Sequence, residues 1–380
     1  MRWSGCCDGF IAGGHPPTRR EPPSPPAPSP CSGRLKILFC STVFTPSVGG
    51  IEHVGALLAS QFQRAGHEVV VVTHTPATAP EHTPFAVLRR PTLRALAARV
   101  AWSDLVFHNQ ISLRLAWPLL WYDRPWVVAH HTWLWQAGAR RGSAWLKTRL
   151  LRRALNVAVS QPLAAALPVP SEVIPNPYAD EVFTRRPEIT RDRDLVFVGR
   201  LVSDKGVALL LQALALLGAR GVVPGLSIVG HGPEESALRA QVRALGLQAQ
   251  VQFVGPLQGT PLAALLNAHR VAVVPSVWEE PFGVVALESM ACGCVPLVAR
   301  SGGLPAAVGR AGRVFEKGSA EDLARGISEL LSNSAANREH LAAAPAHLAR
   351  HRSQRIARRY LQVIEQAQRA HAQSRRLADA

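Results

Sequence analysis

The clearest chemistry in the sequence belongs to two glutamates, Glu280 and Glu288, which are separated by seven residues. The first falls in a predicted loop after an apolar strand at 271–274, and the second lies one to two turns inside a helix predicted from 283 to 291. Eight residues at the helical rise span at most ~12 Å. Carboxylates at this spacing suit a ligand that carries hydroxyl groups at both ends. The alternative is an ordinary strand–loop–helix unit whose glutamates are solvated.

The residues between the two acids indicate what the middle of such a ligand carries. Phe282, Gly283 and Val284 stand at the predicted helix start, where unpaired backbone N–H groups and the helix dipole favour a phosphate. Gly283 has no Cβ, so a ligand can approach its backbone closely. The stretch therefore predicts a phosphate between two hydroxyl-bearing groups.

Two cations in another part of the chain favour the same interpretation. Arg200 follows Gly199 at the end of an apolar strand, and Lys205 comes five residues later, just before a predicted helix. A guanidinium binds phosphate oxygens in pairs, whereas an ammonium acts as a point charge. At the end of a strand and beside a helix start, the two cations are placed to hold a diphosphate.

The stretch EPFGVVALE, continued by MACGCVPLVAR and SGGLP, resembles the E-x7-E signature of the retaining, GT-B-fold glycosyltransferases of family 4. The resemblance implies that Glu280 contacts the hydroxyls of a donor sugar and that Glu288 contacts the ribose of its nucleotide. The pattern G-R-L…K-G matches the phosphate ligands of the family, which implies that Arg200 and Lys205 hold the donor diphosphate.

The resemblance extends to the first half of the chain. The pair Gly49-Gly50 opens a helix after the first strand, and in this family such a loop faces the donor diphosphate from the opposite domain. The stretch VAHHT is similar to the family's strand-end His-Thr, so His131 is expected to face the donor sugar. His108, at the end of another strand, is a weaker candidate for contact with the acceptor.

Three further glycines, Gly199, Gly230 and Gly232, stand in turns that follow apolar strands. In the family these turns line the nucleotide and read its base largely through the backbone, so the side chains here do not reveal the base. Gly302-Gly303, after the strand that follows Glu288, is expected to close the same pocket.

The alternation of apolar strands with helical patterns predicts parallel, doubly wound sheets. A chain of 380 residues is long enough for two domains of ordinary size. Combined with the resemblance, this predicts an α/β protein of the GT-B class, with two Rossmann-like doubly wound domains facing a cleft. The expected parts are a disordered, Pro-rich extension (1–33), an N-terminal acceptor-side domain (34–175), a hinge (176–194), a nucleotide-sugar-binding domain (195–350) and a helix crossing back to the N-terminal domain (351–380).

The charge balance indicates the class of partner. There are 42 Lys and Arg against 26 Asp and Glu, a net charge of +16, which predicts an anionic partner such as a phosphate-bearing ligand or an acidic membrane surface. No motif of nucleic-acid-binding proteins is present, so nucleic acid is not an expected partner. No apolar run is long enough for a transmembrane helix.

No metal and no cofactor are expected, with the nucleotide-diphosphate sugar as donor substrate. The six cysteines lack the spacing of metal ligands, and this usage fits a reducing cytoplasm. Asp192-Arg193-Asp194 is formally a D-x-D metal motif, but it precedes its predicted strand and lies in a charged linker.

Tryptophan and arginine gather in the half of the chain expected to bind the acceptor. Seven of the nine tryptophans lie between Trp102 and Trp145, and the helix that follows, at about 140–155, is basic with a leucine-rich side. A helix of this kind can lie on an anionic bilayer. We therefore expect a cytoplasmic protein with peripheral contact at the inner face of the cytoplasmic membrane. Ordinary packing of the tryptophans is the alternative.

The predicted function is transfer of a hexose-type sugar from a nucleotide-sugar donor to a hydroxyl of a carbohydrate or lipid-linked acceptor. Retention of the anomeric configuration is expected, in the synthesis of cell-surface polysaccharide, lipopolysaccharide or glycolipid. The predicted catalytic groups are Glu280, His131, Arg200 and Lys205. A sugar-nucleotide epimerase or hydrolase on the same fold, or a non-catalytic nucleotide-sugar-binding subunit, are the alternatives.

Overall fold

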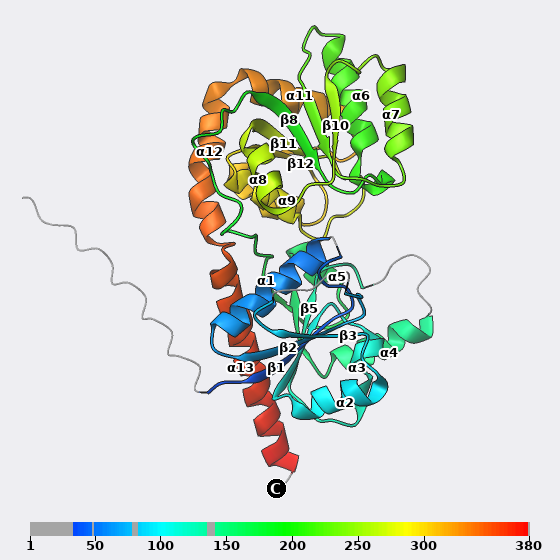
Figure 1. Cartoon of the computed structure of the whole chain (residues 1–380), viewed down its shortest axis with the longest axis vertical. Helices are drawn as coiled ribbons and strands as arrows, with labels where there is room; N and C mark the ends of the chain where they lie inside the picture. The colour runs from blue at the N-terminus through cyan, green and yellow to red at the C-terminus, as the bar shows by residue number, and fades with distance from the viewer. Residues whose placement is uncertain (1–32, 48, 78–82, 135–140, 379–380) are drawn as a thin grey trace, which may run out of the picture. The chain divides into compact units, whose positions relative to one another are not determined.

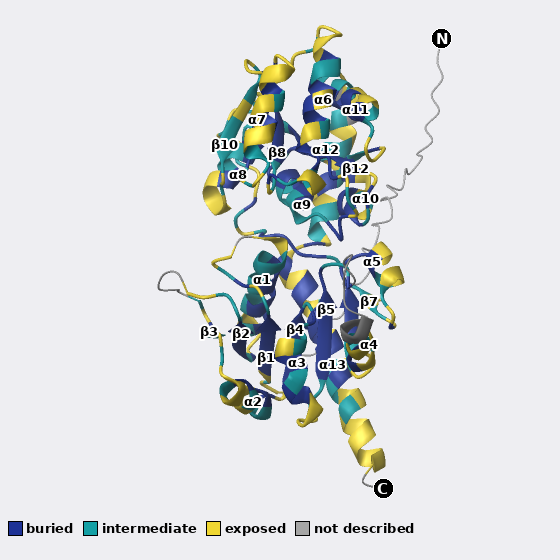
Figure 2. Cartoon of the chain, turned by 90° about the vertical axis from the view of Figure 1, so that its right-hand side faces the viewer, coloured by how far each residue is buried: buried dark blue, intermediate teal, exposed yellow. Residues whose placement is uncertain are grey.

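Two parallel β-sheets form the framework, and their strands are apolar runs that are mostly buried on both faces (Figure 2). The computed structural model describes residues 33–47, 49–77, 83–134 and 141–378, so the predicted extension at 1–33 lies outside the described residues except for Gly33. Arg34–Ala380 form one compact unit. The predicted α/β class with two doubly wound sheets is confirmed (Figure 1).

The first sheet has seven described strands in the order β3-β2-β1-β4-β5-β6-β7, and we call it and its helices the N-lobe. The strands are β1 (Lys36–Ser41), β2 (Glu68–Thr73), β3 (Ala86–Arg89), β4 (Leu105–Asn109), β5 (Trp126–His130), β6 (Leu155–Ala158) and β7 (Glu172–Val173). The helices are α1 (Gly50–Arg64), α2 (Leu93–Trp102), α3 (Leu113–Ala116), the 3₁₀ helix η1 (Trp117–Leu120), α4 (Arg141–Leu151) and α5 (Gln161–Ala166).

The second sheet has six described strands in the order β10-β9-β8-β11-β12-β13, and it belongs to the C-lobe. Its strands are β8 (Arg193–Val198), β9 (Leu226–Val229), β10 (Val251–Gly255), β11 (His269–Val274), β12 (Val295–Ala299) and β13 (Arg313–Phe315). Its helices are η2 (Ser203–Lys205), α6 (Val207–Gly218), α7 (Glu235–Ala244), α8 (Gly259–Asn267), α9 (Val284–Ala291), α10 (Leu304–Val308), η3 (Gly309–Ala311), α11 (Ala320–Ser332) and α12 (Ser334–Ala349).

The strand order reverses at one point in each sheet. Chain order turns round between β1 and β4 in the N-lobe and between β8 and β11 in the C-lobe. In doubly wound sheets, ligands bind beyond the carboxyl ends of the strands at such switch points. The loops after β1, β8 and β11 carry the predicted residues Gly49-Gly50, Arg200 and Glu280, so the topology places them where this rule expects a ligand.

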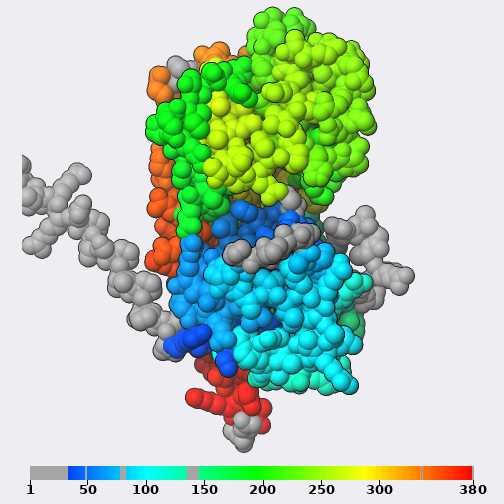
Figure 3. Space-filling view, viewed as in Figure 1, coloured from blue at the N-terminus to red at the C-terminus, as the bar shows by residue number. Residues whose placement is uncertain are grey.

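The last helix, α13 (Ser353–Ala378), belongs to the N-lobe core although it follows the C-lobe in the chain. Figure 1 shows α12, coloured orange, at the side of the C-lobe and α13, coloured red, passing the N-lobe sheet; in the space-filling view of Figure 3 the N-lobe covers most of α13. Tyr360 is fully buried with its ring 5.6 Å from that of Phe107, and Phe107 stacks on Phe39 at 4.9 Å. Burying one such aromatic side chain contributes about 1.5–3 kcal/mol.

The start of α13 is also hydrogen-bonded to the segment between the lobes. The Ser353 backbone N–H donates to Asp180 Oδ1 at 3.0 Å, and Gln61 Nε2 on α1 donates to Ser353 Oγ at 3.2 Å. The bond from Gln61 ties the C-terminal helix to α1, and the bond to Asp180 ties it to the segment between the lobes.

Two expectations need correction. The strand predicted to follow Asp192-Arg193-Asp194 begins within that motif, at Arg193, because Arg193 pairs with His269 of β11 and its N–H donates to the Ala268 carbonyl at 3.0 Å. The basic helix predicted at 140–155 ends at Leu151, while residue 140 lies outside the described residues. Leu150 and Leu151 on its predicted apolar side pack into the N-lobe core, so these two leucines are not available to a bilayer.

Candidate functional site

The most buried acid of the site, Glu280, sits in the loop after β11, and one of its carboxylate oxygens has two partners. Its Oε1 accepts from Ser276 Oγ at 2.7 Å and forms an ion pair with the Lys205 ammonium. The Glu280 residue is 7% exposed and the Lys205 side chain 24%. A carboxylate this buried requires such partners. The structure thus brings two predicted catalytic residues into direct contact, and it adds Ser276, which sequence reasoning missed.

Close packing of the neighbouring loop holds the backbone of Glu280. The Glu280 N–H donates to Ser301 Oγ at 3.3 Å. Gly302 has φ +50°, and a Cβ there would stand 2.0 Å from the Glu280 carbonyl oxygen. Only glycine fits at this position. Gly302 is therefore explained by its contact with the Glu280 loop.

Glu279, which had no predicted role, supports the same loop. Its Oε2 accepts from the Gly302 backbone N–H at 2.7 Å, and its Oε1 pairs with Lys317. Hydrogen bonding to Lys317 holds the pKa of Glu279 below its ordinary value. Its backbone carbonyl accepts from Trp133 Nε1 at 2.7 Å, a bond from the loop after β5 of the N-lobe. Glu279 therefore organises the loop, while Glu280 beside it is the buried acid.

The start of α9 has the features expected of a phosphate site. Gly283 is its N-cap in the left-handed region, with φ 113°, and no side chain caps the first turn of the helix. The first N–H groups of α9 are thus left without a side-chain cap. The Phe282 side chain is buried, with its ring 5.7 Å from that of His351, so only its backbone is available to a ligand. Val284, the first residue of α9, is half-buried.

Glu288 lies on the second turn of α9 and faces a residue of the N-lobe. Its Oε1 is 3.8 Å from Nε2 of His53 on α1. Burial raises the pKa of Glu288 to about 8 and lowers that of His53. Both groups are therefore mainly neutral at pH 7 without a ligand. His53 is not among the predicted site residues, and its position four residues after Gly49 is the signal in the sequence that could have found it.

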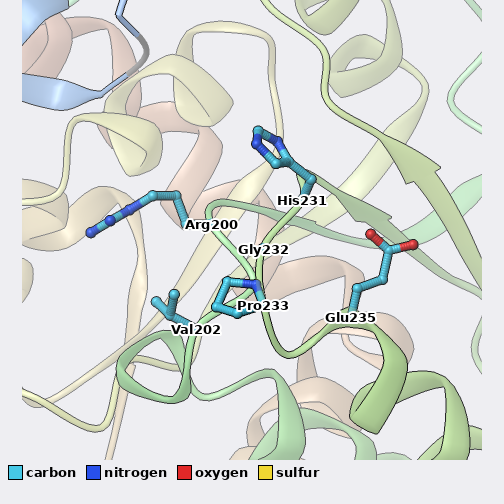
Figure 4. Close-up of a pocket in the computed structure, with 6 residues that line it drawn as sticks. All are labelled: Arg200, Val202, His231, Gly232, Pro233 and Glu235. Carbon is cyan, nitrogen blue, oxygen red and sulfur yellow. The ribbon is translucent and has the colours of Figure 1, made fainter.

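Arg200 extends from the loop after β8 beside a cavity of about 470 Å³. Figure 4 shows that the cavity is lined by two neighbouring loops, which contribute Arg200, His231 and Gly232, and by Glu235 at the start of α7. No hydrogen bond or ion pair joins the guanidinium to another residue in the described part of the chain. The arrangement leaves Arg200 exposed and ready to bind an anion.

Packing explains two of the predicted nucleotide-lining glycines. Gly230 has φ 134°, and a Cβ on it would stand 1.9 Å from the Gly199 carbonyl oxygen. A Cβ on Gly232 would stand 2.3 Å from the carbonyl oxygen of Leu201. The loops after β8 and β9 thus require glycine where they meet, and contact of Gly199, Gly230 and Gly232 with a nucleotide stays a prediction.

The loop after β1 contains an acid close to the predicted phosphate position. Gly49 is the N-cap of α1, and a Cβ on it would stand 2.4 Å from the Glu52 carboxylate. Glu52 also accepts a hydrogen bond from Ser47 Oγ at 3.2 Å. A phosphate at Gly49-Gly50 would therefore require the Glu52 side chain to rotate away.

His131 follows β5 and is buried with one nitrogen engaged. Its Nδ1 lies 3.1 Å from Oδ1 of Asn176, and its backbone N–H donates to Gln110 Oε1 at 2.8 Å. Burial lowers the pKa of His131 to about 4. Its Nε2 is buried and has no hydrogen-bond partner among the described residues. Sequence reasoning missed the roles of Gln110 and Asn176, because their partners lie 21 and 45 residues away.

The weaker candidate for acceptor contact, His108, is wrong. Its ring is fully buried, and its Nδ1 accepts from Trp126 Nε1 at 2.8 Å on the next strand. Burial lowers its pKa to about 3. His108 is a core residue that packs the N-lobe sheet.

The described residues contain no group of three or more His, Cys, Asp or Glu side chains that could hold a metal ion. Asp194 of the formal D-x-D faces Arg270 at 3.5 Å. Within the part of the chain that the structure describes, no helix combines the length and the apolar character needed to cross a bilayer.

Comparison with protein families identifies two matching models that together span most of the folded chain. Residues 180–346 match the model for glycosyl transferases group 1, and residues 48–181 match that for glycosyltransferase family 4. A glycogen synthase of Mycobacterium tuberculosis is 29% identical over 83% of this chain and 90% of its own length. A D-inositol 3-phosphate glycosyltransferase of Catenulispora acidiphila is 40% identical over 36% of this chain and 34% of its own length.

Solved structures show the same fold. HepE of Anabaena, in complex with UDP and glucose, superposes with a TM-score of 0.73 at 22% identity, covering 88% of this chain and 100% of that one. WaaG, a glycosyltransferase involved in lipopolysaccharide biosynthesis, superposes with a TM-score of 0.64 at 19% identity, covering 86% and 99%.

Proposed function

Because the chain belongs to the GT-B-fold glycosyltransferases of group 1, we propose that it transfers a hexose from a nucleotide-sugar donor to a hydroxyl acceptor with retention of configuration. The buried ion pair between Lys205 and Glu280, beside the switch point of the C-lobe sheet, carries this proposal. It combines a group that binds hydroxyls with a group that binds phosphate at one strand end.

The proposed chemistry depends on charge in the departing diphosphate. Arg200 and Lys205 stabilise the negative charge that develops as the bond between sugar and phosphate breaks, and the first N–H groups of α9 add to this. Lys205 has three donors, so it can keep Glu280 while it binds a phosphate oxygen. These cations would hold the leaving group without a metal ion.

The sugar would lie between Glu280 of the C-lobe and His131 of the N-lobe. Glu280, fixed by Ser276 and Lys205, accepts hydrogen bonds from sugar hydroxyls and stabilises the cationic character of the anomeric carbon. Glu288 binds the ribose, and His131 contacts the sugar from the N-lobe. The solved HepE complexes with UDP and with UDP-glucose support a nucleoside-diphosphate sugar as donor.

Relatives suggest the acceptor panel. One is a glycogen synthase, one a D-inositol 3-phosphate glycosyltransferase and one a lipopolysaccharide enzyme, so a glucan, an inositol phosphate and a lipid-linked saccharide are the first acceptors to test. Synthesis of a cell-surface polysaccharide, lipopolysaccharide or glycolipid is the pathway class we propose.

The proposal is tested by nucleotide release from a panel of UDP-, ADP- and GDP-sugars, with and without these acceptors and with EDTA in parallel. We expect release that depends on the acceptor and persists in EDTA, and a product with the donor's anomeric configuration by NMR. Glu280→Gln should lower the rate by about 100-fold or more. The adjacent Glu279→Gln is the matched control. Release or isomerisation without any acceptor would instead support the hydrolase or epimerase.

We also propose peripheral contact with an anionic membrane at the cytoplasmic face. The side chains that support it are exposed: Trp121 at 72% and Trp145 at 65%, with Arg149 packed over the Trp145 ring. Indoles and arginines suit the interface of an anionic bilayer. Sedimentation with phosphatidylglycerol vesicles at low salt should remove wild-type protein from solution more completely than the double variant Trp121→Ser/Trp145→Ser. Equal binding of the two proteins contradicts this role.

A further inference from the structure

The ring of His131 is held in one of its two neutral forms. Its Nδ1 lies 3.1 Å from Oδ1 of Asn176, which can only accept a hydrogen bond. The proton of the neutral ring therefore sits on Nδ1, and Nε2 keeps its lone pair. This Nε2 is buried and has no partner among the described residues.

The backbone around His131 is fixed as firmly as its ring. Gln110 Oε1 accepts from the N–H groups of His131 at 2.8 Å and Thr132 at 3.3 Å. Gln110 itself has φ 73°, a left-handed conformation that residues other than glycine rarely adopt, and its N–H donates to the Ala129 carbonyl at 2.8 Å. Its conformation places its side-chain oxygen against the end of β5.

Asn176 is held from its other side. Its backbone carbonyl oxygen lies 3.1 Å from Nδ1 of His351, the residue two before α13. The His351 ring packs 4.9 Å from that of His347 and 5.7 Å from that of Phe282. Asn176 thus joins His131 in the N-lobe to the loop that carries Glu280.

The neighbouring histidine provides an internal reference with the opposite form. Asn156 Nδ2 donates to the carbonyls of Leu151 at 2.9 Å and Ala154 at 3.0 Å, which fixes the orientation of its amide. Its Oδ1 faces Nε2 of His130 at 3.0 Å, so His130 carries its proton on Nε2. Two adjacent histidines are therefore expected to be opposite tautomers.

We propose that Asn176 is a positioning residue that fixes His131 as a neutral hydrogen-bond acceptor, and that the site thereby selects a donor sugar with a hydroxyl, rather than a carboxylate, facing His131. This inference rests on the proposed function. A hydroxyl can donate to the Nε2 lone pair, whereas a carboxylate would bring a second set of lone pairs to a buried acceptor. Neutral hexoses are thus favoured over uronic acids.

The titratable and charged groups around His131 do not oppose its neutral form. His130 stands beside it on the strand end, and His351 and His347 lie beyond Asn176, next to Arg350. Burial lowers the pKa values of His130, His131 and His351 to about 4, so all three rings are neutral at pH 7. No acidic side chain shifts the pKa of His131.

The first experiment measures the tautomers directly. NMR of the full chain labelled with ¹⁵N-histidine, with the two signals assigned through His130→Gln and His131→Gln, should show His131 protonated at Nδ1 and His130 at Nε2 between pH 6 and 8. A proton on Nε2 of His131 would overturn the proposal. This result does not depend on any nucleotide sugar, so it separates the inference from the proposed function.

The second experiment changes the selectivity. Asn176→Asp supplies a carboxylate that draws a second proton onto His131, so that Nε2–H becomes a donor in the neutral range. The ratio of UDP-glucuronic acid to UDP-glucose affinity, measured by calorimetry, should rise about tenfold or more. Leucine cannot hydrogen-bond to the His131 ring and therefore favours neither its neutral nor its doubly protonated form. Asn176→Leu should not raise this ratio. The histidine signals other than that of His131 report that each variant is folded.

The outcomes are distinct. An Asn176→Asp protein whose NMR spectrum shows a doubly protonated His131 but whose affinity ratio is unchanged contradicts the selectivity role. If wild-type protein binds neither nucleotide, the proposed donor is wrong and the tautomer measurement alone decides the positioning role of Asn176.

Discussion

The strand ends of the two lobes share one topology but carry different chemistry. At the end of the C-lobe strands β8 and β11 stand Arg200, Lys205 and Glu280, three charged groups. At the end of the N-lobe strand β5 stands His131, neutral and buried. The same doubly wound arrangement therefore carries charged groups at the ends of β8 and β11 and a neutral group at the end of β5. From this difference we propose that the diphosphate binds mainly at the C-lobe strand ends and that His131 of the N-lobe contributes selectivity toward the sugar.

The largest expected effect tests the charged strand ends of the C-lobe, by removing the cation Lys205. Lys205→Met should lower the transfer rate by about 100-fold or more, because it removes a proposed phosphate ligand. It also leaves the Glu280 carboxylate buried with Ser276 alone, so the free energy of unfolding should fall by about 2–3 kcal/mol. Steady-state kinetics and urea unfolding measure the two effects.

The matched control is the exposed ion pair of Lys317 with Glu279, the acid next to Glu280 in the chain. Lys317→Met breaks the pair with Glu279, whose side chain is 51% exposed, and should change the free energy of unfolding by less than about 1 kcal/mol. Equal effects of the two substitutions would contradict the special role of the Lys205–Glu280 pair.

How far the sequence predicts this site depends on the distance between partners. The apolar strands and the loops after them follow from local pattern, and the E-x7-E spacing identified Glu280 and Glu288. The pairing of Glu280 with Lys205, 75 residues away, does not follow from pattern, because only folding brings β8 beside β11. The same applies to Asn176 and its partner His131.

Two further cases, one in β4 and one in α4, show why local pattern fails. His108 ends a strand and His131 follows one, and both are buried. His108 is bonded to Trp126 of the neighbouring strand and His131 to Asn176, and nothing in the local sequence distinguishes them. The leucine pattern of α4 predicts a free apolar side, but Leu150 and Leu151 pack into the N-lobe core. Burial is set by neighbours from other strands, which a single helix pattern does not contain.

A smaller effect concerns the buried acid that lacks a cation. Burial raises the pKa of Glu288 from 4.5 to about 8. The folded protein therefore keeps a proton that the unfolded chain releases, so this stabilisation is present below about pH 4.5 and is lost as the pH rises to about 8. Glu288→Gln removes this dependence.

Unfolding in urea at pH 6 and pH 8.5 measures the pH dependence of stability that Glu288 causes. Relative to wild type, Glu288→Gln should gain on the order of 3 kcal/mol of unfolding free energy between these two pH values. Parallel pH profiles for the two proteins would show that Glu288 is paired or exposed in solution.

The smallest expected effect comes from the hydrogen bond that joins the two lobes. Trp133→Phe removes the donor to the Glu279 carbonyl but keeps an aromatic ring. One neutral hydrogen bond contributes about 1 kcal/mol, so kcat/KM should fall by no more than about fivefold. A loss comparable with that of Lys205→Met would mean that contact between the lobes, rather than charge, limits the reaction.

The division between charged and neutral strand ends is tested most directly by comparing two variants in nucleotide binding. Calorimetric titration with UDP should show that Arg200→Met weakens affinity by about tenfold or more. His131→Gln should bind UDP within about twofold of wild type while losing sugar transfer. Equal loss of UDP affinity in both variants, or full affinity in Arg200→Met, would contradict the account.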